Sequence, residues 1–449
     1  MKKALSIQVS LREKISFAGA LGGQNLMYTF VNFFILIFYT DVMGISPAAA
    51  GLMFLVARIW DAFNDLIMGM IVDRTRSRWG KCRPYLIFMS FPIAVTTAIM
   101  FIVPDLEYGG RIVYMWVTYI IWGMAYTSGD ISLWTLAGRI SPRTEDRNLL
   151  ISWGRVAGAV GTAAAVLATV PLKNLLGGDK GGGYFAVAVI FCLLGFLAIF
   201  QGGLITRERT FSHDPDQKIS LKDSLVSIFA NGPLLLVLLS LLLTVIPSLQ
   251  MVMMMYFAKY NLQNEGLMTV IAGISLVTMA LGSGLVPWLT RFISGKKLVL
   301  YSGFVLAFLG TAMYFIGYEN LLIFYVFAAL WGLFNGFPEV IRTTMIANTV
   351  EWMEKKTGKR SDGTIFSTLT FIGKLTAGLG KFVAGLLLTY YGFIANTAQS
   401  PQVLDGLFQS MTIIPGIGSL IMILPLFFYN IDEKTHAKLV KDLALESES

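Results

Sequence analysis

An arginine and two carboxylates interrupt the otherwise apolar segment of residues 56–69. Asp61 and Asp65 are four residues apart, so on a helix they share one face. Asn64 lies beside Asp65, and Arg58 lies one turn before Asp61. Charges cost several kcal/mol at the centre of a bilayer unless they are paired or contact an ion, and they are usually functional there. If this helix spans a membrane, the cluster is a candidate ion site.

Four of the polar residues offer the hard oxygen ligands that a small cation prefers. They are Asp61, Asn64, Asp65 and Thr127. Two carboxylates so close together do not both ionise comfortably without a cation, a proton or a basic neighbour. The sequence therefore predicts a site that responds to Na⁺, Li⁺ or H⁺, with Asp61 and Asp65 as metal ligands if the ion is Na⁺.

A second group of residues suits a sugar. Thr127 and Asp130 are three residues apart on one helix face, and Trp134 lies one turn further along it. Charged groups such as Asp130 and Arg155 bond hydroxyls directionally, and an indole lies flat on the apolar face of a sugar ring. Further polar residues within apolar runs are Gln24, Asn25, Asn335, Glu339, Arg342, Lys374 and Lys381.

Structural roles for these residues stay open from the sequence alone. Arg58 with Asp61, and Glu339 with Arg342, could be ion pairs inside one helix. The two amides of the first apolar run could simply join helices by hydrogen bonds. Lys381, near a helix end, is expected only to extend its ammonium toward the membrane surface.

The elements that must position these residues are membrane helices. The chain has 449 residues, is 55% hydrophobic and 14% charged, and has a mean hydropathy of +0.67. A soluble domain carries about a quarter charged residues. Apolar runs of about 20 residues, each long enough to cross a bilayer, predict an all-α membrane protein with about twelve spans. The expected spans are 16–40, 47–72, 85–104, 111–138, 148–173, 183–205, 230–259, 266–290, 298–317, 321–350, 364–391 and 405–429.

The formal charge of +8 reflects topology rather than nucleic-acid binding. Cations collect in alternate loops, while the loops between them are short and poor in cations. This bias places the basic loops and both termini in the cytoplasm. The cations concerned are Arg74, Arg76, Arg78, Lys81, Arg83, Arg139, Arg143, Arg147, Arg207, Arg209, Lys218, Lys222, Arg291, Lys296, Lys297, Lys355, Lys356, Lys359 and Arg360.

Several functions are disfavoured by what the chain contains. The first apolar run is too long for a signal peptide, so no cleavable signal is expected. Cys82 and Cys192 are placed in a cytoplasmic loop and a span, so no disulfide is expected. Two isolated histidines, His213 and His436, and two distant cysteines make neither a zinc site nor a nucleophile pair. No cofactor is expected, and the chain is not expected to be an enzyme.

Two halves are expected. The limits are 1–205 for the N-terminal six-helix half, 206–229 for a cytoplasmic middle loop, 230–430 for the C-terminal six-helix half and 431–449 for a cytoplasmic tail. A weak repeat supports them: Gly69-Met-Ile-Val-Asp73-Arg74 corresponds to Gly284-Leu-Val-Pro-Trp-Leu-Thr-Arg291, each followed by a basic turn. The glycines are expected to let two helices approach. Six plus six spans is an alternating-access architecture with binding near the midplane.

At these residues the chain resembles the glycoside–pentoside–hexuronide:cation symporter family, a melibiose-permease-like branch of the major facilitator superfamily. The similarity extends from about Ser10 to Asn430. The strings that carry it are Phe38-Tyr-Thr-Asp41-Val-Met-Gly, Phe54-Leu-Val-Ala-Arg58-Ile-Trp-Asp61-Ala-Phe-Asn64-Asp65, Thr75-Arg-Ser-Arg-Trp-Gly-Lys81, Trp122-Gly-Met-Ala-Tyr126-Thr127 with Asp130, and Lys356-Thr-Gly-Lys-Arg360.

The resemblance implies a sugar symporter of the bacterial inner membrane, active as a monomer and driven by Na⁺, H⁺ or Li⁺. It implies cation binding at Asp61, Asn64, Asp65 and Thr127, and sugar contacts at Gln24, Asn25, Tyr126, Asp130, Trp134, Arg155 and Lys374. Lys374 would lie between the two sites and, with Arg58, form the coupling network.

Two departures from melibiose permease bear on the sugar. That protein has an aspartate where this chain has Asn25, and a tryptophan where this chain has Glu339, with Arg342 one turn later. Glu339 and Arg342 therefore join the expected sugar-binding residues, and a preference for galactosides is not implied. Asp130 favours a neutral glycoside, while the cations Arg155, Arg342 and Lys374 favour an acidic one.

The expected function is import of a glycoside or oligosaccharide with a monovalent cation. The main alternative is a symporter for an acidic sugar such as a glucuronide or sulfosugar. A lipid-moving transporter is a further alternative, since some relatives of this fold carry lysolipids. An enzyme and a channel are disfavoured, because the chain lacks a nucleophile constellation and its lone charges do not form rings.

Overall fold

The computed structural model describes residues 9–141, 143–178, 182–209, 228–357 and 362–431, together with residues 435–436, 439 and 441. Over these residues the secondary structure consists of helices, and no strand occurs in them. Nine helices in these ranges are long and apolar enough to cross a membrane. The prediction of an all-α membrane protein is confirmed.

The chain divides into two compact units. Unit 1 contains Met1–Pro215 and Phe393–Thr397, and unit 2 contains Asp216–Gly392 and Ala398–Ser449. The predicted limits of the halves, the middle loop and the tail stay predictions. Most of that loop, including His213, Lys218 and Lys222, lies outside the described residues.

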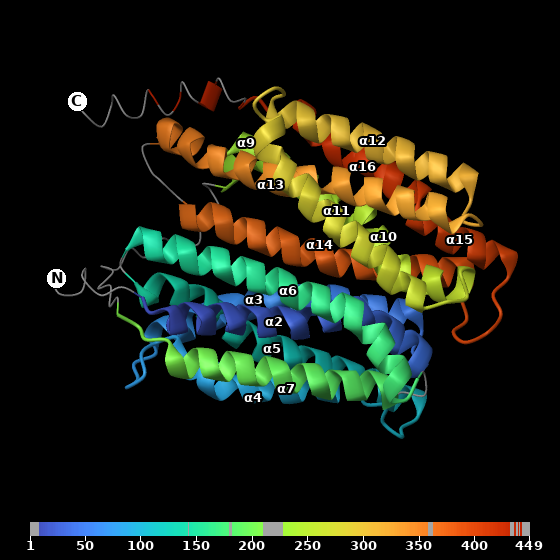
Figure 1. The fold of residues 1–449 in the computed structure, drawn as a ribbon, viewed down its shortest axis with the longest axis horizontal. Helices are drawn as coiled ribbons and strands as arrows, with labels where there is room; N and C mark the ends of the chain where they lie inside the picture. The colour runs from blue at the N-terminus through green and yellow to red at the C-terminus, as the bar shows by residue number, and fades with distance from the viewer. Residues whose placement is uncertain are drawn as a thin grey trace. The chain divides into compact units, whose positions relative to one another are not determined.

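In its described residues, unit 1 contains six helices and one π-helical turn. They are α2 (Leu11–Ile37), the π turn η1 (Phe38–Val42), α3 (Pro47–Arg74), α4 (Arg83–Ile99), α5 (Tyr108–Ile140), α6 (Thr144–Leu176) and α7 (Gly182–Ile205). Helix α2 packs against both α6 and α7, and α4 packs against α5 and α7 (Figure 1). A capping box of Ser10 and Glu13 starts α2, because each side chain accepts a backbone N–H of the other.

Unit 2 repeats the helical plan with more breaks. Its elements are α9 (Gly232–Leu243), α10 (Val245–Tyr256), the π turn η2 (Phe257–Asn261), α11 (Gly266–Leu289), α12 (Gly295–Ile316), α13 (Leu321–Thr357), α14 (Asp362–Tyr391), α15 (Pro401–Met411) and α16 (Ile413–Phe427). Helix α11 lies along α13, and α12 lies along α16 (Figure 1).

Two of the expected spans, 230–259 and 405–429, are each divided into two helices. The first breaks at Thr244 and the second at Thr412. Proline lacks a backbone N–H, so Pro247 and Pro415 each remove a hydrogen bond to the carbonyl four residues earlier. Each pair of helices still makes one continuous apolar segment, Gly232–Asn261 and Pro401–Phe427.

Helix α3 is inside out compared with a helix of a soluble protein. Its charged side chains Arg58 and Asp61 are buried, while Ile59, Phe63 and Met70 are about half exposed. Polar residues that face the protein and apolar residues that face outward are the pattern of a membrane helix. The buried charges keep α3 out of the nine apolar spans, although its length of 28 residues suffices to cross.

The segment of residues 206–209 follows α7 and ties together one end of unit 1. The Glu208 carboxylate accepts the backbone N–H groups of Lys81, Cys82 and Arg83 at distances of 2.8–3.1 Å, and so caps the start of α4. Arg209 forms an ion pair with Glu13 at 2.9 Å. Its backbone N–H and its guanidinium also donate to the carbonyls of residues 139 and 140 at the end of α5.

The repeat motif does not pack as expected. A Cβ added at Gly69 or at Gly284 would meet nothing within 4 Å, so these glycines do not mediate close helix contacts. The two units share a different feature. The first span of each unit ends in a five-residue π turn that begins with phenylalanine, Phe38 in unit 1 and Phe257 in unit 2.

Candidate functional site

Helices α3 and α5 meet in register along their polar faces. Thr127 Oγ1 donates to Asp65 Oδ1 at 3.1 Å. One turn earlier on both helices, a Cβ built on Gly123 would lie 3.1 Å from Asp61 Oδ1. The missing side chain of Gly123 is therefore what lets the Asp61 carboxylate lie against α5. The two contacts are four residues apart on each helix, so the helices run parallel here.

Arg58 extends this register by one more turn. Its Nη1 donates to Asp61 Oδ2 at 2.8 Å, which confirms the ion pair within the helix. Its Nη2 lies 3.4 Å from the Tyr119 hydroxyl on α5 and 3.4 Å from Asn32 Oδ1 on α2. The guanidinium thus holds three helices together and neutralises one of the two neighbouring carboxylates.

Asn64 supplies a side chain whose hydrogen bonding is incomplete. It is 3% exposed, and its Nδ2 has no hydrogen-bond partner in the described ranges of the chain. The two ends of a side-chain amide exchange places by a rotation about one bond, so this group can present its oxygen instead. A buried polar group without a partner costs about 1–3 kcal/mol. With Asp61 and Asp65 on the same helix, the donor set fits a small cation.

Helix α2 contributes a polar stripe at four-residue spacing. Gln24 Nε2 donates to Asp130 Oδ1 at 2.6 Å. Tyr28 stacks on Tyr126, with ring centroids 5.0 Å apart and an interplanar angle of 26°. Asn32 accepts from the Arg58 guanidinium. Because Gln24, Tyr28 and Asn32 share one face, α2 lines the same side of the site as α5.

Aromatic rings form a wall beside the carboxylates. Tyr28, Trp122 and Tyr126 stack on one another, with centroid distances of 5.0–6.5 Å and interplanar angles below 30°. The indole N–H of Trp122 donates to Thr97 Oγ1 at 3.0 Å, so the ring is fixed in orientation. Stacked faces of this kind suit the apolar side of a sugar ring.

Three further predicted sugar residues of unit 1 lie outside these contacts. The Asn25 amide donates to the Leu21 carbonyl of its own helix at 2.9 Å. Trp134 on α5 and Arg155 on α6 are exposed. Their assignment to the sugar site stays a prediction.

The polar residues predicted in unit 2 lie on α13 and α14. No ion pair joins Glu339 to Arg342, although the Glu339 carboxylate lies close enough to act electrostatically on the guanidinium; Glu339 is exposed, while Arg342 is 7% exposed. The Arg342 Nη1 instead lies 3.5 Å from the Met422 sulfur. Lys374 is half-buried on α14. Lys381 does not extend outward as expected, because it lies well inside α14 and is 4% exposed.

Sequence reasoning missed five residues of this site. They are Tyr28, Asn32, Tyr119, Trp122 and Gly123. Two of them could have been predicted, because Tyr28 and Asn32 follow Gln24 along α2 at intervals of four residues. Gly123 gave no signal in the sequence, since its role is to leave room for a side chain of another helix. In the described part of the chain no three His, Cys, Asp or Glu residues gather as a divalent-metal site does.

Comparisons with known proteins agree with this architecture. Residues 16–433 match the family described as MFS/sugar transport protein. The uncharacterized symporter YnaJ of Bacillus subtilis is 32% identical over 97% of this chain and 95% of its own length. The isoprimeverose transporter of Lactiplantibacillus pentosus is 30% identical over 96% and 91%. A putative sulfoquinovose importer of Salmonella typhimurium is 28% identical over 98% and 94%.

Solved structures show the fold. The nucleoside transporter NupG superposes with a TM-score of 0.66 at 14% identity and covers 93% of this chain and 100% of its own. A bacterial homolog of the lysosomal transporter Spinster, inward-facing and occupied, gives 0.70 at 14% identity over 95% and 97%. Both proteins are transporters, and so are the sequence relatives. This chain belongs to the family of MFS/sugar transport proteins and has the major facilitator fold of a membrane transporter.

Proposed function

We propose that this chain is a secondary active symporter that imports a glycoside or oligosaccharide with a monovalent cation, Na⁺ or H⁺, by alternating access. The family supports a sugar as cargo. The names of two relatives, an isoprimeverose transporter and a putative sulfoquinovose importer, support it as well. We place the protein in a bacterial inner membrane with both termini in the cytoplasm, acting as a monomer.

The observation that carries the proposal is the parallel contact between α3 and α5. It brings two carboxylates, a buried amide without a full set of partners and a hydroxyl to one helix interface. In this proposal Asp61, Asn64, Asp65 and Thr127 bind the cation. Two carboxylates so close together favour a bound cation, a proton or a basic neighbour, and Arg58 is the basic neighbour of Asp61.

The sugar is assigned to the neighbouring surface of α2 and α5. The Gln24 amide donates to the charged Asp130 carboxylate at 2.6 Å. Sugar hydroxyls can accept from the amide and donate to the carboxylate, beside this hydrogen bond or in place of it. The stacked rings of Tyr28 and Tyr126 offer a flat apolar face. Trp134 and Arg155 complete the assignment in unit 1, and Asn25 lies beside Gln24 on α2.

Coupling follows from the fact that α5 carries groups of both sites. Thr127 bonds the cation ligand Asp65, and Asp130, three residues later, belongs to the sugar site. A bound cation shared by Asp61 and Asp65 weakens the attraction between Asp61 and Arg58, so that Arg58 can rearrange. The sugar site is then complete only when the cation is present, and reciprocity requires the sugar to tighten cation binding. We assign Lys374 to the same charge network.

The test is transport by purified protein in proteoliposomes. A panel of radiolabelled glycosides is offered with and without Na⁺, at several pH values, to identify cargo and ion. We expect Asp65→Cys to abolish uphill accumulation while exchange of labelled for unlabelled sugar continues at a reduced rate. Concentrative uptake at the wild-type level by this variant would show that the cation site lies elsewhere.

A matched control comes from another carboxylate of unit 1. Glu145 is 86% exposed at its side chain and pairs with Arg143 at the start of α6. Glu145→Cys removes the same charge from the same unit without touching the helix contact. We expect it to accumulate sugar as the wild type does.

One observation favours an acidic sugar as the second candidate. Arg342 is buried, and a thioether sulfur is its hydrogen-bond partner among the described residues. A buried guanidinium without a carboxylate costs several kcal/mol unless an anion compensates it. Competition by neutral and by anionic glycosides in Arg342→Ala and Glu339→Ala separates the two cargoes. Loss of inhibition by anionic sugars alone in Arg342→Ala supports the acidic cargo.

A further inference from the structure

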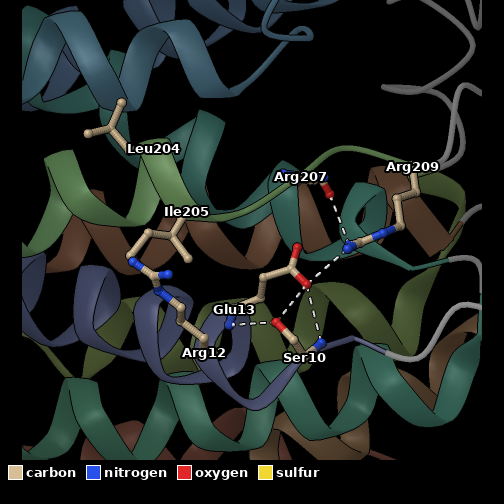
Figure 2. A pocket seen from close by; sticks show the side chains of 7 residues that line it. All are labelled: Ser10, Arg12, Glu13, Leu204, Ile205, Arg207 and Arg209. Atoms are coloured by element: carbon tan, nitrogen blue, oxygen red, sulfur yellow. Dashed lines mark hydrogen bonds and ion pairs between the residues drawn. The ribbon is translucent and has the colours of Figure 1, made fainter.

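A pocket of about 460 Å³ lies in unit 1 where α2 begins and α7 ends. Its lining combines cations with apolar side chains, as Figure 2 shows. The residues are Ser10, Arg12, Glu13, Leu204, Ile205, Arg207 and Arg209. Both helices belong to spans that cross the membrane, so the pocket lies at the level of one membrane surface.

Two of its three arginines form no ion pair with any described residue. Arg209 pairs with Glu13 at 2.9 Å, and Figure 2 shows its side chain reaching to that carboxylate. Arg12 and Arg207 are exposed at the pocket, and neither forms an ion pair within the described part of the chain. With one carboxylate and three guanidiniums, the lining carries an excess of two positive charges.

The start of α2 is not what attracts an anion here. Its first N–H groups are already capped, because the Ser10 hydroxyl accepts from the backbone of Glu13 and the Glu13 carboxylate accepts from the backbone of Ser10. The second oxygen of this carboxylate, Oε1, is buried and has no hydrogen-bond partner among the described residues. Within the described part of the chain, the pocket therefore offers two guanidiniums outside any ion pair and one acceptor that lacks a donor.

An apolar track leads away from the pocket along α7. Leu193, Leu197 and Leu204 share one helix face and are each about half exposed. Leu204 lies in the pocket wall, so the track ends at the cations. A hydrocarbon chain on this track would therefore end at the cations that line the pocket.

We propose that this pocket binds an anionic phospholipid whose head group carries a hydroxyl, as phosphatidylglycerol does. The phosphate lies between Arg12 and Arg207, for which guanidinium groups are well suited. The head-group hydroxyl donates to Glu13 Oε1, and one acyl chain follows the leucine track of α7. The lipid is a bound partner of unit 1 and not the transported cargo, and the site does not depend on the function proposed above.

The test measures lipid retention by the full-length protein in detergent, using native mass spectrometry. The protein is titrated with phosphatidylglycerol, phosphatidylethanolamine and phosphatidylcholine of matched chain length. We expect one tightly retained phosphatidylglycerol. An arginine near an anionic lipid contributes about fivefold in affinity, so Arg12→Gln with Arg207→Gln should weaken retention about 25-fold.

The matched control removes two other exposed arginines, with Arg76→Gln and Arg291→Gln combined. This variant has the same net charge, and we expect retention to be unchanged. Leu204→Trp fills the pocket without changing its charge and should also displace the lipid. This variant still tests the proposal if the arginine variant does not fold.

Three results would overturn the proposal. Equal loss of lipid in the control variant would show that the lipid is held by the general positive charge of the protein and not by this pocket. Equal retention of phosphatidylethanolamine would remove the requirement for a net negative head group. Displacement of the lipid by inorganic phosphate at the same concentration would assign the pocket to a free anion.

Discussion

Replacing Gly123 with alanine tests the contact between α3 and α5 without removing any polar group. The added methyl would lie 3.1 Å from Asp61 Oδ1, whereas ordinary contacts begin at 3.4 Å. The carboxylate must therefore retreat from α5 by about 0.3 Å. In the proposed site this moves one cation ligand away from the ion and leaves the others in place.

The size of the effect follows from Coulomb's law. With an effective dielectric constant of about 20 and an oxygen–cation distance of about 2.4 Å, a retreat of about 0.3 Å costs about 0.8 kcal/mol. That corresponds to about a fourfold rise in the cation concentration that half-saturates sugar exchange. Alanine also favours the helix by up to about 1 kcal/mol over glycine, so the variant should fold.

The assay is sugar exchange in proteoliposomes at rising cation concentration. Gly138 on the same helix is the control, because a Cβ there would meet nothing within 4 Å. We expect Gly138→Ala to leave the half-saturating concentration unchanged. If Gly123→Ala also leaves it unchanged while both proteins fold, Asp61 is not a ligand in the position described here.

Three other substitutions test separate parts of the molecule. Gln24→Ala removes a donor of the proposed sugar site, and a hydrogen bond from a neutral amide to a sugar hydroxyl is worth about 0.5–1.5 kcal/mol, so the half-saturating sugar concentration should rise about two- to tenfold; an unchanged value would exclude Gln24 from the sugar site. Glu208→Ala leaves three backbone N–H groups uncapped and should lower the free energy of unfolding by about 2 kcal/mol. Glu145→Ala, at an exposed position, should leave the free energy of unfolding unchanged. Equal unfolding temperatures for the two variants would contradict the capping role of Glu208. Arg342→Met removes a poorly compensated buried charge and should raise stability by about 1 kcal/mol; a clear drop in the unfolding temperature would mean that Arg342 has a structural anionic partner.

The sequence was sufficient for the membrane architecture because a bilayer imposes a simple rule. Apolar runs must be about 20 residues long, and the ends of the helices follow from capping residues such as Ser46 before Pro47. The buried cluster on α3 was also predictable, since charges within an apolar run stand out. The breaks at Thr244 and Thr412 were missed, because a proline within an apolar run does not reveal whether the helix continues.

The partners of the site residues were harder to predict than the residues themselves. Spacing along one helix identifies neighbours three or four positions apart, such as Arg58 and Asp61. It says nothing about rotation of a neighbouring helix, which decides that Tyr119 and Asn32 contact the same guanidinium. The same limitation explains Glu339, which has the spacing of a partner for Arg342 but lies on the exposed side of α13.

The 206–209 segment has a consequence for how the protein is made. All of the contacts described for it reach backwards along the chain, to Glu13, to residues 81–83 and to residues 139–140. Each of these partners has left the ribosome before Arg209 is translated. Domains fold as units during synthesis, beginning at the N-terminus. The first half can therefore form these contacts in the membrane while the second half is still being translated.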